Sequence, residues 1–227
     1  MVRVMKLVTG LILLCMLSGC SWWWGSSPMG RGTPGDLYRN GIDYYQDGRY
    51  KKAVGKFQRL KEEYPLSKYA ILAEMGVADS YFSAGDYIAA EANYRDFMDF
   101  HPTNENLPYV MYQLGMCNYN QMYEIDRDQT NTRIAIEDFE RLISRFPSSK
   151  FSFMAEQRLR DCRKRLGDHE FYVGYFYFKR GEYQAALARF ENVQQHYANL
   201  GLDYKVSYFL HETRKELEKI KHKDVKN

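Results

Sequence analysis

The chain has 227 residues and a formal net charge of only +3. Such a balance gives no reason to expect nucleic-acid binding, which depends on many basic contacts to phosphates. Aromatic residues make up 16% of the chain, 20 of them tyrosines, while there are only six prolines. This composition favours an all-helical fold with aromatic packing.

The first nineteen residues are predicted to be a signal peptide. Arg3 and Lys6 precede an apolar run over 7–17. Eleven apolar residues are too few for a membrane-spanning helix, which needs about 20, whereas a basic start followed by a short apolar run is typical of a secretory signal. Removal of the two basic residues lowers the formal charge from +3 to about +1.

The end of this run resembles a bacterial lipobox. Leu17, Ser18 and Gly19 lead into Cys20, and small residues in front of a cysteine suit cleavage and lipidation. The resemblance implies that Cys20 becomes the first residue and carries N-palmitoyl and S-diacylglycerol groups, which together form a stable membrane anchor. Ser21 in the next position indicates the outer membrane. The alternative is an ordinary signal with a chance cysteine. Residues 20–35 are interpreted as the lipidated N-terminus and a linker.

Four segments of the chain share one helical pattern, in which an alanine is followed four residues later by an aromatic residue. Residues at this spacing lie on one face of a helix. The pairs are Ala53/Phe57, Ala90/Tyr94, Ala135/Phe139 and Ala186/Phe190. Eight residues after the aromatic, a proline that ends the helix follows in three segments, and Ala198 stands there in the fourth.

A partner helix is predicted upstream of each segment. Twelve residues before the alanine lie Gly41, Ala78 and Gly174 in three of the units, where a small residue lets the two helices approach closely. This register is the tetratricopeptide signature. In the third unit Gly115 comes eight residues too early, and an insertion over 123–131 accounts for the shift.

The pattern predicts an all-α solenoid of about five tetratricopeptide-like hairpins. Glycines at the turns 47–50, 84–87, 166–169 and 180–183 separate the helices. The ten expected helices cover 36–47, 50–64, 67–84, 87–100, 105–123, 132–146, 149–165, 168–180, 183–197 and 202–220. Residues 36–147 form three N-terminal hairpins, residues 148–220 form two C-terminal hairpins, and residues 221–227 are a basic tail.

The sequence resembles the BamD family, helical lipoproteins of the outer-membrane β-barrel assembly (Bam) machinery. The residues that carry the resemblance are YVMYQLG (109–115), the segment 126–151 that begins with DRDQTN, and the segment 158–183 that begins with RLRDC. The resemblance implies a location on the periplasmic face of the outer membrane. It also implies that the N-terminal hairpins receive unfolded β-barrel precursors and that the C-terminal hairpins dock BamA, in a complex with other Bam lipoproteins.

The predicted ligand-binding groove lies on the first helix of each N-terminal hairpin, which supplies the concave face of such solenoids. Tyrosines provide apolar area with a polar tip, and methionines adapt to varied ligands. The groove residues are Tyr38, Ile42, Tyr45, Met75, Asp79, Phe82, Tyr109, Tyr112, Met116 and Tyr119. The alternative for each residue is packing against the neighbouring hairpin.

Four further residues are candidates for a partner interface. Asp126, Arg127 and Asp128 lie in the insertion, and Arg180 ends the aromatic-rich segment 170–181. Two carboxylates without further ligands are a weak metal signal, so a capped loop is favoured and no metal is predicted. Cys117 and Cys162 are expected to behave as small buried hydrophobic residues.

No catalytic pattern is present in the sequence, so neither enzymatic activity nor a cofactor is predicted. The five histidines lack metal-ligand spacing, and no nucleophile motif is found. Two alternatives to a Bam-complex lipoprotein are another periplasmic repeat scaffold, for example one that coordinates envelope or division machinery, and a cell-wall hydrolase on a helical scaffold. The hydrolase would require a clustered acid or nucleophile.

Overall fold

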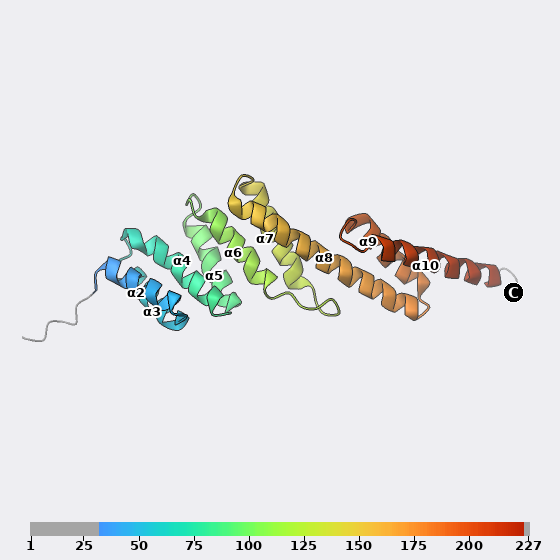
Figure 1. The fold of residues 1–227 in the computed structure, drawn as a ribbon, viewed down its shortest axis with the longest axis horizontal. Helices are drawn as coiled ribbons and strands as arrows, with labels where there is room; N and C mark the ends of the chain where they lie inside the picture. The colour runs from blue at the N-terminus through green and yellow to red at the C-terminus, as the bar shows by residue number, and fades with distance from the viewer. Residues whose placement is uncertain (1–31, 225–227) are drawn as a thin grey trace, which may run out of the picture.

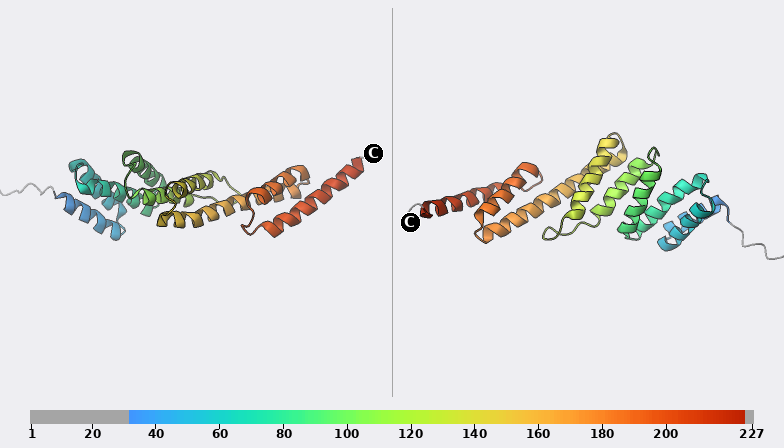
Figure 2. Two further views of the ribbon diagram at one scale, coloured as in Figure 1. Left: turned by 90° about the horizontal axis from the view of Figure 1, so that it is seen from above. Right: turned by 180° about the vertical axis from the view of Figure 1, so that it is seen from behind.

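The computed structural model describes residues 32–224, and within that range the regular structure is entirely helical. The helices of this part of the chain are α2 (Pro34–Gln46), α3 (Tyr50–Glu63), α4 (Lys68–Ser83), α5 (Tyr87–Phe100), α6 (Leu107–Tyr119), α7 (Thr130–Arg145), α8 (Lys150–Lys179), α9 (Tyr183–His196) and α10 (Asp203–Asp224). Consecutive helices pack side by side into one elongated array (Figures 1 and 2). The prediction of an all-α hairpin solenoid is confirmed.

Each hairpin is closed by an aromatic ring that lies against a glycine or alanine of its first helix. Phe57 of α3 is fully buried between Gly41 of α2 and Gly76 of α4. A Cβ atom on Gly41 would lie only 2.4 Å from Cε1 of Phe57, so the ring occupies the space of the missing side chain. The rings of Phe139 and Phe190 close the third and last hairpins in the same way, which confirms the predicted pairing of positions.

The turns within three hairpins contain glycines in the left-handed region of backbone space. The φ angles of Gly48, Gly85 and Gly181 are 71°, 80° and 76°, values that residues with a side chain rarely adopt. The helices α3, α5 and α7 end within two residues of a proline, at Glu63, Phe100 and Arg145. The predicted turn glycines at 47–50, 84–87 and 180–183 and the predicted helix stops are therefore confirmed.

The predicted break at 166–169 is wrong, because α8 is a single helix from Lys150 to Lys179 in place of two helices. Gly167 lies inside this helix and is buried. A Cβ atom at Gly167 would lie 3.0 Å from Cβ of Tyr197, so the glycine serves as a contact surface for the segment after α9. Helical glycine costs about 1 kcal/mol relative to alanine, and this packing offsets the loss. Ser149 caps the start of the helix, its hydroxyl accepting a hydrogen bond from the backbone N–H of Phe151 at 3.2 Å.

Helix α8 joins the two parts of the solenoid. Its first half, with Ala155, Leu159 and Cys162, belongs to the core shared with α6 and α7. Its second half packs on α9 and α10 through Phe171 and Phe178. Figure 2 shows α8 running from one group of helices to the other. The N-terminal and C-terminal hairpins are thus connected by regular helix, without a loop.

Candidate functional site

Asp79 of α4 forms the polar centre of the surface made by the first helices of the N-terminal hairpins. Its Oδ1 atom accepts hydrogen bonds from the hydroxyl of Tyr94 at 2.6 Å and from the hydroxyl of Tyr109 at 2.7 Å. Gln113 in turn donates to the Tyr109 hydroxyl at 3.3 Å. Burial raises the pKa of Asp79, against the opposing effect of the two tyrosine hydrogen bonds. The cluster joins helices α4, α5 and α6.

Tyr38 and Tyr45 of α2 lie on the same surface as Asp79. The ring of Tyr38 stacks on Tyr69 with 5.3 Å between centroids, and burial followed by the charge of Asp79 raises the pKa of Tyr38. Tyr45 shares a hydrogen bond with Ser83 at 2.9 Å. Two predicted groove positions of α2 are therefore held against α4 by aromatic and polar contacts.

The remaining groove positions of α4 and the first of α6 are half-buried and continue this surface. Met75 and Phe82 lie one turn to either side of Asp79 along α4 and pack, with Tyr109, against the core of the second hairpin. We call the following set the tyrosine face: Tyr38, Ile42, Tyr45, Met75, Asp79, Phe82 and Tyr109. The tyrosine face is carried by α2, α4 and α6, and in Figure 1 the helices α4 and α6 lie nearer to the viewer than α5 and α7. The structure thus brings seven of the ten predicted groove residues together.

The other three groove residues of α6 belong to a second cluster with α8. Tyr112 is only 7% exposed and packs in the core with Phe139, so the packing alternative describes it better than an open groove. The Tyr119 hydroxyl donates to Asp161 at 3.2 Å and Met116 is half-buried beside it. Arg158 of α8 approaches the Tyr119 hydroxyl at 3.5 Å.

Several residues that complete these clusters were missed in the sequence. Tyr69 stacks on Tyr38, and Phe151 lies between Tyr109 and Tyr112, with centroid distances of 5.4 Å and 6.0 Å. Arg158 was missed as well. Phe151 and Arg158 are seven residues apart and therefore share a face of α8. That spacing is the signal in the sequence that could have identified the two residues. It becomes informative only once α8 is known to pack against α6.

The insertion between α6 and α7 is a loop fixed to the middle of α8. The ring Nδ1 of His169 donates to the carbonyl oxygen of Ile125 at 2.6 Å. Arg165 donates to a carboxylate oxygen of Glu124 at 2.9 Å and to the carbonyl oxygen of Tyr123 at 3.2 Å. These contacts hold the loop with its charged residues pointing outward, since Asp126, Arg127 and Asp128 are all exposed.

The charged loop residues are engaged in local contacts. Asp128 accepts from the backbone N–H of Thr130 at 2.9 Å, as in a capped loop, and this bond lowers its pKa. The Arg127 guanidinium lies 4.1 Å from the ring centroid of Tyr123. Among residues 32–224 no cluster of three or more histidines, cysteines or carboxylates could hold a metal. Arg180 ends α8, pairs with Glu182 at 2.8 Å and lies over Phe176.

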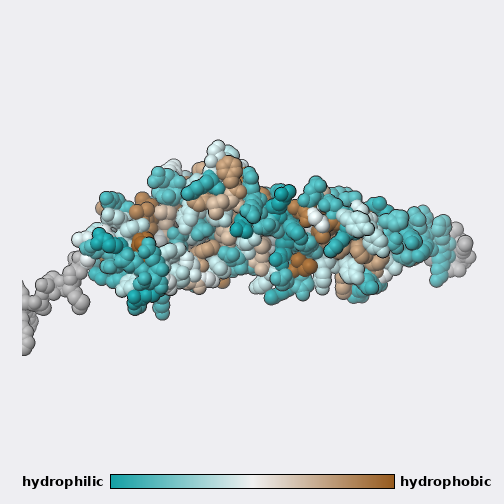
Figure 3. Space-filling view, viewed as in Figure 1, coloured by the Kyte–Doolittle hydropathy of each residue, from teal (hydrophilic) through white to brown (hydrophobic). Residues whose placement is uncertain are grey.

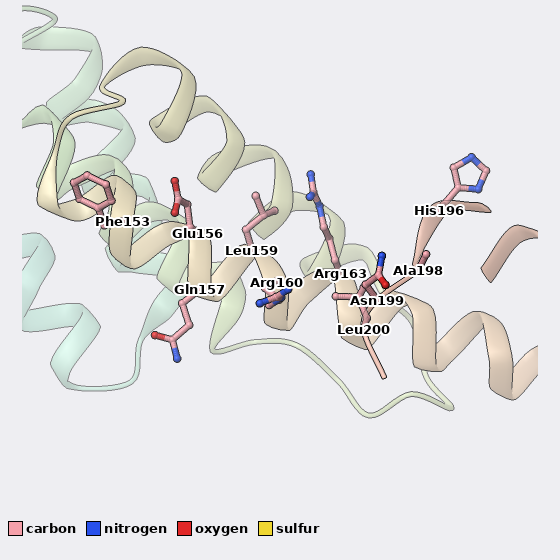
Figure 4. Close-up of a pocket in the computed structure, with 10 residues that line it drawn as sticks. All are labelled: Phe153, Glu156, Gln157, Leu159, Arg160, Arg163, His196, Ala198, Asn199 and Leu200. Carbon is pink, nitrogen blue, oxygen red and sulfur yellow. The ribbon is translucent and has the colours of Figure 1, made fainter. Parts of the chain in front are cut away.

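A cleft that was not predicted separates the first half of α8 from the segment after α9. Its volume is about 650 Å³. Figure 4 shows Leu159 and Arg163 of α8 facing the cleft from one side and Asn199 and Leu200 from the other. The segment on the far side of the cleft directly follows Tyr197, the residue that packs against Gly167 of α8.

The predicted lipidation residue Cys20 lies outside the described residues. In the described range, none of the helices is both long enough and apolar enough to cross a membrane. Cys117 and Cys162 are free and buried, as expected. Burial raises the pKa of both thiols to about 12, which keeps them protonated and unreactive at neutral pH.

The pH dependence of stability is expected to report the environment of Asp79. Because its pKa is raised above 3.8 in the folded state, the folded protein binds the proton more readily than the unfolded chain does. Protonation therefore adds stability as the pH falls through the folded pKa, and the gain is complete below 3.8. Asp79→Asn keeps an oxygen for both tyrosines but cannot titrate.

We expect the stability of the wild type, measured relative to Asp79→Asn, to rise as the pH is lowered from neutral toward 3.8. Urea unfolding of both proteins, followed by circular dichroism, measures the two free energies of unfolding at each pH. The titration of the other carboxylates affects both proteins equally and is removed when one free energy is subtracted from the other. A difference that stays constant with pH would mean that Asp79 is not buried in this way.

Together these features define a class of protein: a helical-repeat protein of the tetratricopeptide type, with an aromatic surface on the first helices of its N-terminal hairpins. The chain belongs to the YfiO family, described as "Outer membrane lipoprotein", which matches residues 31–226. It is similar to the "Outer membrane protein assembly factor BamD" of Vibrio cholerae, with 27% identity over 84% of this chain and 82% of the relative. The protein of the same name from Haemophilus influenzae is 24% identical to this chain, over 95% of this chain and 85% of the relative.

A solved tetratricopeptide protein from Thermus thermophilus is similar at 16% identity, over 78% of this chain and 98% of that one, with a TM-score of 0.42.

Proposed function

We propose that this protein is a non-enzymatic, lipid-anchored scaffold of the outer-membrane β-barrel assembly complex. In this proposal it binds unfolded barrel precursors on the tyrosine face and docks a BamA-like barrel subunit with its C-terminal hairpins. The observation that carries the first part is the tyrosine face itself, with Asp79 at its centre. Membership of the outer membrane lipoprotein family and the printed names of the relatives support the setting.

The chemistry of the tyrosine face suits an extended peptide with aromatic side chains. Met75, Phe82 and the rings of the tyrosines offer apolar area, and methionine adapts its shape to different ligands. Hydroxyl groups such as that of Tyr45 can bond to the backbone of an unfolded segment. Such groups recognise the backbone and aromatic character of a segment without requiring one fixed sequence, as a receptor for many precursors must.

We expect Tyr45→Ala combined with Met75→Ala to weaken binding of a precursor's C-terminal peptide by about tenfold, as expected for loss of one aromatic and one methionine contact. Fluorescence anisotropy of a labelled peptide measures the affinity. Both residues are half-buried, so helical circular dichroism and the melting temperature must be checked.

The matched control is Tyr175→Ala with Met154→Ala on α8, where the two side chains are 40% and 46% exposed. This pair is expected to bind the peptide as the wild type does. Equal affinity for all three proteins would assign Tyr45 and Met75 to packing alone.

Exposed aromatic residues support docking of a partner by the C-terminal hairpins. Tyr172 and Phe176 are four residues apart on α8 and remain 43% and 48% exposed. Tyr204 and Tyr208 have the same spacing on α10 and are 85% and 53% exposed. Aromatic residues are enriched at the cores of protein interfaces. Arg180 follows this segment, and its guanidinium can turn from Glu182 to a partner's carboxylate.

We expect Tyr172→Ser with Phe176→Ser to abolish most of the co-purification of a large β-barrel partner from outer membranes, since aromatic anchors dominate interface energy. The control is Phe153→Ser, which removes a 62% exposed ring from the other half of α8. If the double variant recovers as much barrel partner as the control, docking does not use this surface. If the wild type recovered division or envelope-synthesis proteins and no β-barrel partner, the result would favour the alternative of a scaffold that coordinates envelope or division machinery.

The proposed location is the periplasmic face of the outer membrane, with Cys20 as the anchor. The lipobox Leu17–Cys20 and the following Ser21 support it, as does the family description. Intact-mass spectrometry of the membrane-extracted protein tests it directly. A mature chain that begins at Cys20 and carries three acyl chains is expected, and an unmodified cysteine would contradict the anchor.

A further inference from the structure

The second helix of the first hairpin carries an unusual concentration of positive charge. Residues 48–61 contain six basic side chains and no acidic one. These side chains are Arg49, Lys51, Lys52, Lys56, Arg59 and Lys61. The whole chain, by contrast, has a nearly balanced 32 basic and 29 acidic residues. The imbalance is local to residues 48–61, since Asp47 precedes this window and α3 ends with Glu62 and Glu63.

The basic residues differ in how far they face away from the core: Arg49, Lys51 and Lys52 are exposed, whereas Lys56 and Arg59 are half-buried at the edge of the solvent side of α3. Lys52, Lys56 and Arg59 repeat at the spacing of one helix face. The buried positions Ala53, Phe57 and Leu60 occupy another face. We call Arg49, Lys51, Lys52, Lys56 and Arg59 the α3 basic face. Figure 3 shows strongly hydrophilic residues gathered over the first hairpin.

Most of this charge is not neutralised within the molecule. Arg59 pairs with Glu63 at 2.6 Å, and Arg49 approaches Asp47 at 3.9 Å. In the part of the chain that the structure describes, Lys51, Lys52 and Lys56 form no ion pair. Three lysine ammonium groups are thus available to a partner.

An aromatic ring and an open cleft lie among these cations. The guanidinium of Arg49 is 4.6 Å and the ammonium of Lys52 is 5.8 Å from the ring centroid of Tyr44. The cleft has a volume of about 530 Å³ and is lined by residues 48–52 of the first hairpin and by Ser83 and Ala84 of the second. A surface that combines cations, tyrosine rings and a shallow hollow suits phosphate headgroups and the interface around them.

The position of α3 in the chain indicates which anionic surface it meets. Thr33 precedes α2, and Cys20 lies 13 residues before Thr33. Thirteen residues span at most about 45 Å, whereas α2 is only about 20 Å long. If Cys20 is anchored as proposed above, the whole first hairpin stays within reach of the membrane that holds the anchor.

We propose that the α3 basic face binds an anionic phospholipid surface and thereby orients the solenoid on the membrane. This inference rests on the proposed lipid anchor only because the anchor keeps the first hairpin near the membrane. The positive charge that would bind the phosphate headgroups is a property of α3 itself. Each lysine or arginine near a charged membrane surface contributes about a fivefold gain in association. The acyl chains hold the protein at the membrane, and the basic face fixes which side of the first hairpin points toward it.

The test compares the lipidated, full-length mature protein in vesicles of pure phosphatidylcholine and in vesicles that also contain phosphatidylglycerol. Amine acetylation, read site by site by mass spectrometry, reports how accessible each lysine is. We expect acetylation of Lys51, Lys52 and Lys56 to be about threefold or more slower with the anionic lipid. Lys179 and Lys205, exposed at the other end of the molecule, are expected to react equally in both.

Two further arms make the test specific. High salt shortens the screening length and is expected to remove the protection. In Lys52→Gln with Lys56→Gln, Lys51 remains as a reporter, and the difference between its rates in the two vesicles is expected to be clearly smaller than in the wild type. Lys52 is exposed and Lys56 is half-buried, so circular dichroism and the melting temperature verify that the fold of this variant is unchanged.

Equal acetylation of Lys51, Lys52 and Lys56 in the two vesicles would overturn the proposal. Protection that arises only when a partner protein is added would also overturn it, since the face would then bind an acidic protein segment. Flotation with pure phosphatidylcholine vesicles reports the lipid anchor separately. Loss of flotation would therefore identify a failure of the anchor and not of the basic face.

Discussion

Phe57→Ala is expected to lower the free energy of unfolding by about 3–5 kcal/mol. Phe57 is fully buried and contacts the bare backbone of two glycines, Gly41 of α2 and Gly76 of α4. Its loss removes the contact that closes the first hairpin and also the one that joins this hairpin to the second. Neither neighbour has a side chain that could move into the space, so the cavity stays open.

Urea unfolding followed by circular dichroism at a fixed protein concentration measures this change. The control is Phe100→Ala, which removes the same side chain from a position that is 75% exposed. That substitution is expected to change stability by less than about 0.5 kcal/mol. If the two substitutions cost the same, the closure of the first hairpin does not depend on Phe57.

Gly115→Ala is expected to destabilise the protein by about 1–3 kcal/mol, although alanine is the better helix former. A Cβ atom at Gly115 would lie 2.5 Å from Cε1 of Phe139. Phe139 is fully buried, so its ring has no free volume to move into. The methyl group therefore forces α6 and α7 apart.

The same contact predicts a rescue and a contrast. Phe139→Leu shortens the side chain, so the double variant is expected to be less destabilised than the sum of the single variants, as a double-mutant cycle measures. Gly55→Ala is the contrast, because no atom lies within 4 Å of a Cβ at that position. It is expected to gain about 0.5–1 kcal/mol from reduced backbone freedom. A destabilised Gly55→Ala, or additive costs in the cycle, would contradict this account.

The repeat contacts could be predicted because they depend on residues at fixed spacing. An alanine with an aromatic residue four positions later, and a small residue twelve positions earlier, describe a contact that one hairpin makes within itself. The structure shows this contact at Gly41 with Phe57 and at Gly174 with Phe190. It is also present at Gly115 with Phe139, in the unit interrupted by the insertion.

The false break in α8 shows where such reasoning stops. Glycine ends a helix when the next residues need a left-handed turn, as at Gly181 with φ of 76°. Glycine continues a helix when another segment packs against it, as Tyr197 does at Gly167. The two cases share the same local sequence signal. Only the position of a residue thirty places further along the chain separates them.

The candidate site was predictable in part for the same reason. Helical spacing on single helices placed Tyr38, Tyr45 and Asp79 on related faces. It could not show that Tyr94 and Tyr109 bond to one oxygen of Asp79, because that depends on three helices meeting. Nor could it show that Tyr112 is covered by its neighbours.

The continuous helix α8 rigidly connects the third hairpin to the C-terminal helices α9 and α10. Thirty residues of α-helix are about 45 Å long, and the first half is fixed to the core of the third hairpin while the second carries α9 and α10. A rotation of about 10° at one end of such a rod displaces the other end by about 8 Å. In the function proposed above, a partner that tilts the C-terminal hairpin would therefore also move the tyrosine face, so that docking of the partner and delivery of the precursor would be coupled through α8.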